Sequence, residues 1–315
     1  MKISELLNSG RVSFSFEVFP PKADTDFDRI QEATRKIAAL KPDFMSVTYG
    51  AGGGTSRHTV NIAEDIQRTC GVPALAHLTC VSSTRDMVHE GLARMQQAGI
   101  ENVLALRGDI PADGKVAGDY QYASQLIEDI HRAGDFCIGA ACYPEGHVEC
   151  ANRSLDMEHL RQKVACGCDF LTTQMFFDNS VLYSFLYRML AKGIDVPVIA
   201  GVMPVTNSRQ IARACAMSGA TLPARFRSIM DKFGDDPVCM KQAGIAYATD
   251  QIIDLPLDGA HEDLRVKKAR GPDDLLGDLS GAGTLILGRR GGDVDGLMDA
   301  VCKLVEGQGA VIIRR

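Results

Sequence analysis

The sequence predicts an α/β fold, a (β/α)8 barrel of the TIM type. The chain has 315 residues, enough for one barrel of about 250 residues with some surplus. Short apolar, β-branched runs recur at intervals of roughly thirty residues, and a stretch with helical periodicity follows each run. Polar residues gather where these runs end. In a barrel such ends converge on one mouth, whereas a doubly wound open sheet, which the alternation alone also allows, offers only a crevice.

Alternation and turn residues define the elements along the chain. The first strand places Ser13, Ser15 and Glu17 on one face and Phe14 and Phe16 on the other. Several of the intervening helices end at a glycine. The expected strands are Val12–Val18, Phe44–Tyr49, Ala74–Thr79, Val103–Arg107, Cys137–Cys142, Phe170–Gln174 and Val198–Val202. The expected helices are Asp26–Leu40, Thr59–Thr69, Thr84–Ala98, Ala123–Ala133, Met157–Cys166, Val181–Ala191 and Ser208–Met217.

Composition and charge narrow the classes of function. A 45% hydrophobic and 23% charged chain is typical of globular proteins and excludes collagen-like or wholly disordered ones. A net charge of −6 favours a small-molecule partner over nucleic acid or an anionic membrane. No signal peptide or long apolar run is found, so we expect a cytoplasmic protein. The 10 cysteines are then expected to be reduced, and none of their spacings predicts a metal site.

Glu17 is the leading candidate for acid–base chemistry. It ends the first strand, where a barrel mouth would lie, although it could also be a loop acid paired with Lys22. Burial against apolar neighbours would raise its pKa, which suits a general acid near neutral pH.

The other motifs at strand ends are individually weaker. The loop Gly50–Thr55 lacks both the P-loop ending and the dinucleotide fingerprint, so it is a turn or a place where backbone approaches a ligand. His77 could be structural, and Arg107 with Asp109 could form a salt bridge. Tyr143–His147 combines an aromatic ring with titratable groups, which suits stacking on a planar ligand.

Taken together and in order, the motifs of the first 255 residues resemble the bacterial methylenetetrahydrofolate reductase family. The resemblance is carried by Phe16–Lys22, Val47–Gly53, His77–Cys80, Leu106–Asp109, Tyr143–His147, Thr173–Asp178 and Gly201–Pro204. It implies a barrel that holds FAD non-covalently at the carboxyl ends of its strands. NADH or NADPH would reduce the flavin in a ping-pong mechanism, and methylenetetrahydrofolate would then be reduced to 5-methyltetrahydrofolate, which supplies methyl groups for methionine synthesis. The family also implies a homo-oligomer, and some relatives take electrons from a partner protein.

The resemblance assigns roles by matching position. Glu17 would be the general acid, and Asp109 would contact both pterin and flavin. Gln174 and Gln210 would contact the folate. Positions for FAD or nicotinamide are Thr48, Tyr49, Ala51, His77, Arg107, Gly108, Asp109, Ala123, Tyr143, His147, Asp156, His159 and Lys163. His159 and Gln162 stand where relatives often carry Asn and Arg.

After Leu255 the chain changes character, which divides it into a barrel of residues 1–255 and an atypical tail of residues 256–315. Pro256 interrupts a helical pattern, and no Phe, Tyr or Trp follows Tyr247. The family's eighth strand, a His-x-Tyr-Thr/Ala-Leu-Asn-Arg-like segment, is missing. However, codons for Glu262–Gly271 read one base later can encode Lys-Ile-Tyr-Ala-Leu-Lys-Lys-Pro-Glu-Val.

A one-base frameshift between Leu255 and Glu262 is therefore our hypothesis for the tail. The rival interpretation is a genuine tail, with strands at Thr284–Leu287 and Val311–Ile313 and a helix at Leu297–Val305, either strand closing the barrel. Two other function classes stay open: a flavin-free pterin-binding barrel such as a methyltransferase or an aldolase, and a non-catalytic folate-binding or scaffold protein.

Overall fold

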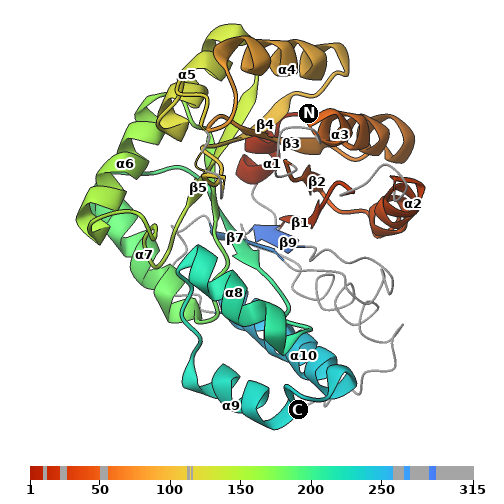
Figure 1. The fold of residues 1–315 in the computed structure, drawn as a ribbon, viewed down its shortest axis with the longest axis vertical. Helices are drawn as coiled ribbons and strands as arrows, with labels where there is room; N and C mark the ends of the chain where they lie inside the picture. The colour runs from red at the N-terminus through yellow and green to blue at the C-terminus, as the bar shows by residue number, and fades with distance from the viewer. Residues whose placement is uncertain are drawn as a thin grey trace.

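A computed structural model describes residues 1–9, 13–21, 27–49, 56–111, 114, 116–257, 266–269 and 284–288. Seven parallel strands follow one another around a curved sheet, each pairing with the next along the chain (Figure 1). They are β1 (Ser13–Val18), β2 (Phe44–Val47), β3 (Ala74–Thr79), β4 (Asn102–Leu106), β5 (Cys137–Cys142), β6 (Phe170–Thr173) and β7 (Val198–Val202). The seven expected strands are confirmed, with ends that differ by at most two residues.

A helix follows each of these strands and lies on the outside of the sheet. The helices are α2 (Phe27–Ala38), α3 (Ser56–Cys70), α4 (Arg85–Gln97), α5 (Ala123–Ala133), α6 (Arg153–Ala165), α7 (Asn179–Ala191) and α8 (Ser208–Ser218). Helix α6 begins four residues before its expected start because Asn152 caps it, its side chain accepting a hydrogen bond from the backbone N–H of Leu155 at 2.9 Å.

Three helices were not expected in this form. Helix α1 (Ile3–Asn8) precedes the first strand, and α9 (Ala224–Phe233) and α10 (Pro237–Leu257) follow α8. Helix α10 extends one residue past Pro256, where the sequence predicts an interruption. Helices α8, α9 and α10 lie together on one side of the sheet (Figure 1), and their apolar faces form a separate cluster around Phe177, Phe226 and Met240.

Two short strands from the tail complete a closed barrel. Strand β8 (Val266–Ala269) pairs in parallel with β7. Strand β9 (Thr284–Gly288) pairs antiparallel with β1, with β7 and with β8. The expected strand at Thr284–Leu287 is therefore confirmed, whereas Val311–Ile313 and Leu297–Val305 lie outside the described residues. Closure by an antiparallel strand departs from the eight parallel strands that a (β/α)8 barrel predicts.

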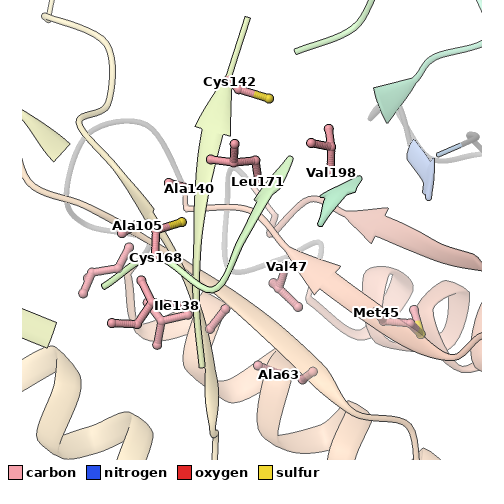
Figure 2. Close-up of a cluster of buried hydrophobic side chains, with 14 of the residues drawn as sticks. Met45, Val47, Ala63, Ala105, Ile138, Ala140, Cys142, Cys168, Leu171 and Val198 are labelled. Atoms are coloured by element: carbon pink, nitrogen blue, oxygen red, sulfur yellow. The ribbon is translucent and has the colours of Figure 1, made fainter. Parts of the chain in front are cut away.

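The barrel has two apolar layers. Outward-facing strand residues pack beneath the helices, and Figure 2 shows part of this layer, including Met45, Val47, Ile138, Ala140 and Leu171. A second cluster fills the interior at the amino-terminal end of the strands, where helix α1 closes the opening. It comprises Ile3, Leu6, Leu7, Phe44, Leu75, Leu104, Cys137, Phe170 and Ile199. This apolar plug leaves the opposite, carboxyl-terminal end of the interior for polar side chains.

Candidate active site

A large cavity opens at the carboxyl ends of the strands, with a volume of about 1390 Å³. Ligand sites in proteins typically measure about 300–1,000 Å³, so this cavity has room for a large cofactor together with a second ligand. Fourteen of the residues that the sequence singles out line it: Glu17, Thr48, Tyr49, His77, Arg107, Gly108, Asp109, Ala123, Tyr143, His147, Asp156, His159, Lys163 and Gln174. They come from strands, loops and helices of the first six units, as a barrel mouth requires.

Glu17 lies near the end of β1, on the inward face together with Ser13 and Ser15, while Phe16 and Val18 pack outward beneath the helices. Its side chain is only 17% exposed. Burial raises the pKa of Glu17 to about 7, and a hydrogen bond from Ser46 opposes the rise. The carboxyl group can therefore carry a proton at neutral pH, which is the property that the sequence anticipates for an acid at this position.

His77 of β3 lies next to Glu17 and is buried. Its Nε2 is 2.7 Å from the hydroxyl of Ser46 and 3.6 Å from Oε2 of Glu17. Burial lowers the pKa of His77 to about 3, so the imidazole is neutral at physiological pH. His77 and Glu17 thus form no ion pair at neutral pH, although they are neighbours.

Arg107 follows β4, and its guanidinium group pairs with Glu149, another residue that lines the cavity. It donates two parallel hydrogen bonds to Glu149, at 2.6 and 2.7 Å. This pairing holds the pKa of Glu149 below its usual value. The next residue, Gly108, has φ = +87°, and a Cβ there would lie 3.1 Å from Cβ of Thr79. The backbone therefore needs glycine to turn from the strand into the cavity wall.

The loop after β5 and helix α6 form another wall. The ring of Tyr143 packs edge-on against His147, with centroids 4.5 Å apart, and burial raises the pKa of Tyr143 to about 12. The backbone N–H of His147 donates to Asp156 at 3.3 Å. Lys163 donates to the carbonyl oxygen of Ala141 at 2.8 Å, and burial lowers its pKa. A partly buried ammonium whose hydrogen bond goes to a carbonyl group is suited to an anionic ligand.

The remaining lining residues suit a planar polar ligand. The side-chain oxygen of Gln174 accepts from the backbone of Met175 at 2.9 Å, which leaves its NH2 group as the donor toward the cavity. Asp109 is exposed in the same cavity. At the outer end, Tyr122 and His159 pack with ring centroids 5.8 Å apart. Ala51 lies outside the described residues, and so does the side chain of Gln210 in α8.

Two neighbours of the site were not expected from the sequence. Ser46 contacts both Glu17 and His77, and Glu149 pairs with Arg107. Ser46 could have been found from the alternation Phe44-Met45-Ser46, because a serine on the inward face of an apolar strand is unusual and indicates a polar contact there. Glu149 follows His147 by two residues, in a loop whose path no periodicity predicts.

In the part of the chain that the structure describes, no group of three His, Cys, Asp or Glu side chains is arranged to hold a metal ion. Likewise, no helix among those residues combines the length and apolarity needed to cross a bilayer.

Comparisons with known proteins identify a matching family model and several similar chains. The methylenetetrahydrofolate reductase family model matches residues 2–264. The 5,10-methylenetetrahydrofolate reductase of Pectobacterium carotovorum subsp. carotovorum is 33% identical over 253 residues, which are 80% of this chain and 84% of that protein. A protein of Oryza sativa named probable methylenetetrahydrofolate reductase (NADH) is 33% identical over 264 residues, 79% of this chain and 44% of its own.

A solved structure shares the fold at low sequence identity. It is an uncharacterized protein from Clostridium thermocellum, described as binding two copies of 5-methyl-5,6,7,8-tetrahydrofolic acid. Its TM-score is 0.51 at 14% identity, with 81% of this chain and 89% of that chain covered. The family model spans the seven parallel strands and the residues that line the cavity, and the bacterial relative is similar over most of its own length. The chain therefore belongs to the methylenetetrahydrofolate reductase family.

Proposed function

We propose that this chain reduces 5,10-methylenetetrahydrofolate to 5-methyltetrahydrofolate, with FAD as a non-covalent cofactor and NADH as the reductant. The observation that carries the proposal is Glu17, a largely buried carboxyl group at the cavity whose pKa lies near neutrality. A group of this kind can give a proton to a substrate nitrogen at physiological pH.

The described residues fit FAD in three respects. The cavity is larger than one small ligand needs. Arg107 and Lys163 supply the positive charge that a diphosphate group requires. Tyr122 and His159 offer flat surfaces at the outer end, where an adenine ring could stack. The chemistry that FAD supplies when bound is hydride transfer, from reduced nicotinamide and then to folate, in a ping-pong sequence.

The chain's own residues prepare the folate for that hydride. Glu17 donates its proton to a ring nitrogen of the folate, and opening of the five-membered ring leaves a cationic iminium group. The carboxylate of Asp109, in the same cavity, stabilises that positive charge. The NH2 group of Gln174 donates to the edge of the pterin or of the nicotinamide amide. NADH rather than NADPH, and a homo-oligomeric state, stay predictions drawn from the family.

Replacing Glu17 tests the proposal because the two half-reactions can be followed separately. Glu17→Gln should retain reduction of the flavin by NADH, measured as anaerobic bleaching of the yellow protein. It should lose about 10²- to 10⁴-fold in the rate at which reduced flavin is reoxidised by methylenetetrahydrofolate. Glu32→Gln on the exposed face of α2 is the matched control and should leave both rates unchanged.

Other outcomes identify the alternatives. A colourless protein that binds no added FAD but binds folate would favour a flavin-free pterin-binding barrel or a scaffold protein. Equal losses in both half-reactions of Glu17→Gln would show that Glu17 supports the flavin site rather than donating a proton to folate.

A further inference from the structure

Glu17, Ser46 and His77 form a row of polar side chains across three neighbouring strands. Strand pairing places Ser46 of β2 directly beside Glu17 of β1. On its other side Ser46 pairs with Leu75 of β3, and His77 lies two residues after Leu75. The hydroxyl of Ser46 is 2.7 Å from Nε2 of His77, and hydrogen bonding from Ser46, its neighbour across the strand pair, opposes the rise that burial causes in the pKa of Glu17. His77 and Glu17 themselves are 3.6 Å apart, too far for a direct hydrogen bond. Ser46 is therefore the link between the other two.

The number of protons fixes the direction of these hydrogen bonds. A charged Glu17 is an acceptor only, so the single hydroxyl proton of Ser46 must point toward it. The oxygen of Ser46 must then accept its second bond from His77. Since burial lowers the pKa of His77, the imidazole is neutral and carries one proton. That proton must lie on Nε2 when Glu17 is charged.

We propose that Ser46 and His77 are positioning residues for Glu17: the Nε2–H of His77 holds the Ser46 hydroxyl, which donates to the Glu17 carboxylate. This inference rests on the proposed role of Glu17 as the acid. The chain of hydrogen bonds orients the carboxyl group and stabilises its charged form, while burial destabilises that form. The balance keeps the proton of Glu17 both available and replaceable near neutral pH, whereas burial alone would keep it bound.

Few other titratable or charged side chains in the described structure lie close enough to Glu17 to affect its protonation. Within the described residues, His77 is the titratable side chain that faces it from β3, and β2 contributes Ser46, which does not titrate. Strand β9 places Thr284 beside Glu17 on the other edge of β1. The charged groups of the same cavity are Arg107, Asp109, Glu149, Asp156 and Lys163, which line its other walls. The causes of the Glu17 pKa shift are burial and the Ser46 hydrogen bond.

Titration of Glu17 in the cofactor-free protein tests the inference without using activity. The 13Cδ resonance of Glu17, assigned by its loss in Glu17→Gln, reports the protonation of the carboxyl group. Ser46→Ala should raise the titration midpoint by about one pH unit, since a hydrogen bond to the charged form is lost. His77→Leu should raise it by less, because Ser46 keeps its hydroxyl but loses the donor that orients it.

Ser15→Ala is the matched control. Ser15 is also a buried serine on the inward face, and the described structure gives its hydroxyl no hydrogen-bond partner. This variant should leave the Glu17 midpoint unchanged. If Ser46→Ala fails to fold, Ser46→Thr, which retains the hydroxyl, should keep the wild-type midpoint, and the 15N shifts of His77 in the wild-type protein provide an independent measurement. They should show the Nε2–H tautomer above the Glu17 midpoint.

Two results would overturn the inference: a midpoint in Ser46→Ala no higher than in Ser15→Ala, or a His77 proton on Nδ1 when Glu17 is charged. Either can occur while Glu17→Gln still loses only the folate half-reaction, so failure of the positioning pair and failure of the proposed function can be told apart. If the positioning pair and the role of Glu17 as the acid both hold, the rate of the folate half-reaction should fall at a higher pH in Ser46→Ala than in the wild type. This shift should be seen even where the maximal rate of the variant is lower.

Discussion

Burial of Glu17 ties the stability of the fold to pH. Its pKa is about 7 in the folded protein against 4.5 for an unperturbed glutamate, so the folded state binds more protons between these values. The free energy of unfolding must then fall as pH rises from about 4.5 through 7. Glu17→Gln removes this titration. Relative to wild type, its unfolding free energy should increase by about 2 to 3 kcal/mol between pH 5 and pH 8.

Urea unfolding of both proteins at pH 5, 6, 7 and 8, without added FAD, measures this difference. Glu32→Gln serves as the control, because Glu32 is exposed and its interaction with Lys36 lowers its pKa, so it titrates below this window. A difference between Glu17→Gln and wild type that stays constant over these pH values would contradict the raised pKa.

The pairing of Arg107 with Glu149 makes a second prediction at the level of residues. Both guanidinium N–H groups that face Glu149 are engaged, so a phosphate group of the proposed cofactor would have to compete with the carboxylate. Because Glu149 is 48% exposed, the pair is worth only about 0.2 to 1 kcal/mol. Glu149→Gln should therefore bind FAD about two- to five-fold more tightly at low salt.

Quenching of FAD fluorescence on titration with protein measures that affinity. Glu158→Gln, which disrupts a pair with Lys192 and Arg161 outside the cavity, is the control and should bind FAD like the wild type. Weaker binding by Glu149→Gln would show instead that Glu149 holds Arg107 in the orientation that the cofactor needs.

How well single residues could be predicted depended on whether their partners are local or distant. The position of Glu17 at the cavity follows from two-residue alternation and the strand's end, both visible in the sequence. Its high pKa also required knowledge of what buries it. Ser46 gains its importance from strands β1 and β3, which approach it only in the folded barrel. The role of Glu149 likewise depends on a loop reaching residue 107.

At the level of elements, β5 packs against its neighbours without free space in the apolar plug that fills the amino-terminal end of the barrel. A Cβ added at Gly139 would lie 2.4 Å from Cζ of Phe170 and 2.9 Å from Cδ1 of Leu104, within the apolar plug. Gly139→Ala should therefore lower the free energy of unfolding by about 1 to 3 kcal/mol through overpacking. Thermal or urea unfolding measures the loss.

Gly91→Ala provides the matched control for this substitution. Gly91 lies within helix α4, and its added Cβ would meet only Cδ1 of Leu78 at 3.8 Å. Because alanine favours a helix over glycine, this variant should be as stable as the wild type or gain up to about 1 kcal/mol. Equal effects of the two substitutions would contradict the close packing around Gly139.

The elements that the sequence predicted are those with long, regular patterns. Helix α1 escaped prediction because six residues carry only three apolar positions, too few to establish a period. Helix α9 did carry a signal: Phe226, Ile229, Met230 and Phe233 follow the i, i+3, i+4, i+7 pattern and pack in one cluster. It could have been predicted, whereas the start of α6 depended on recognising the cap at Asn152.

At the level of the whole molecule, the strands that close the barrel come from the tail, beyond the part of the chain that matches the family model. The family match ends at residue 264, close to the point where aromatic residues cease. Beyond it, β8 continues the parallel order, but β9 runs antiparallel and occupies the edges of both β1 and β7. Periodicity predicted seven units because each is a local pattern. It could not predict closure, which depends on how distant strands pair.

A frameshift between Leu255 and Glu262 would explain this break, and it is directly testable. We expect resequencing of that stretch of the gene to reveal a one-base difference that restores the reading Lys-Ile-Tyr-Ala-Leu-Lys-Lys-Pro-Glu-Val. That segment supplies an aromatic residue and a strand that can pair in parallel with both β7 and β1, as a (β/α)8 barrel requires. An uninterrupted, confirmed reading frame through Arg315 would refute the hypothesis.

The effect of the altered tail on stability can be measured by expressing the 315-residue chain and the chain with the restored reading frame in parallel. The restored chain should unfold at a higher temperature and retain FAD through gel filtration, because a single parallel strand would pair with both β7 and β1, as in a regular (β/α)8 barrel. The 315-residue chain depends on β9, whose five residues are separated from β8 by fourteen others. Deleting residues 270–315 from this chain should therefore lower its unfolding temperature and weaken FAD retention further, since β1 and β7 would lose their antiparallel partner. If that deletion changes neither property, β9 does not close the barrel in solution, and the first seven units hold the site without it.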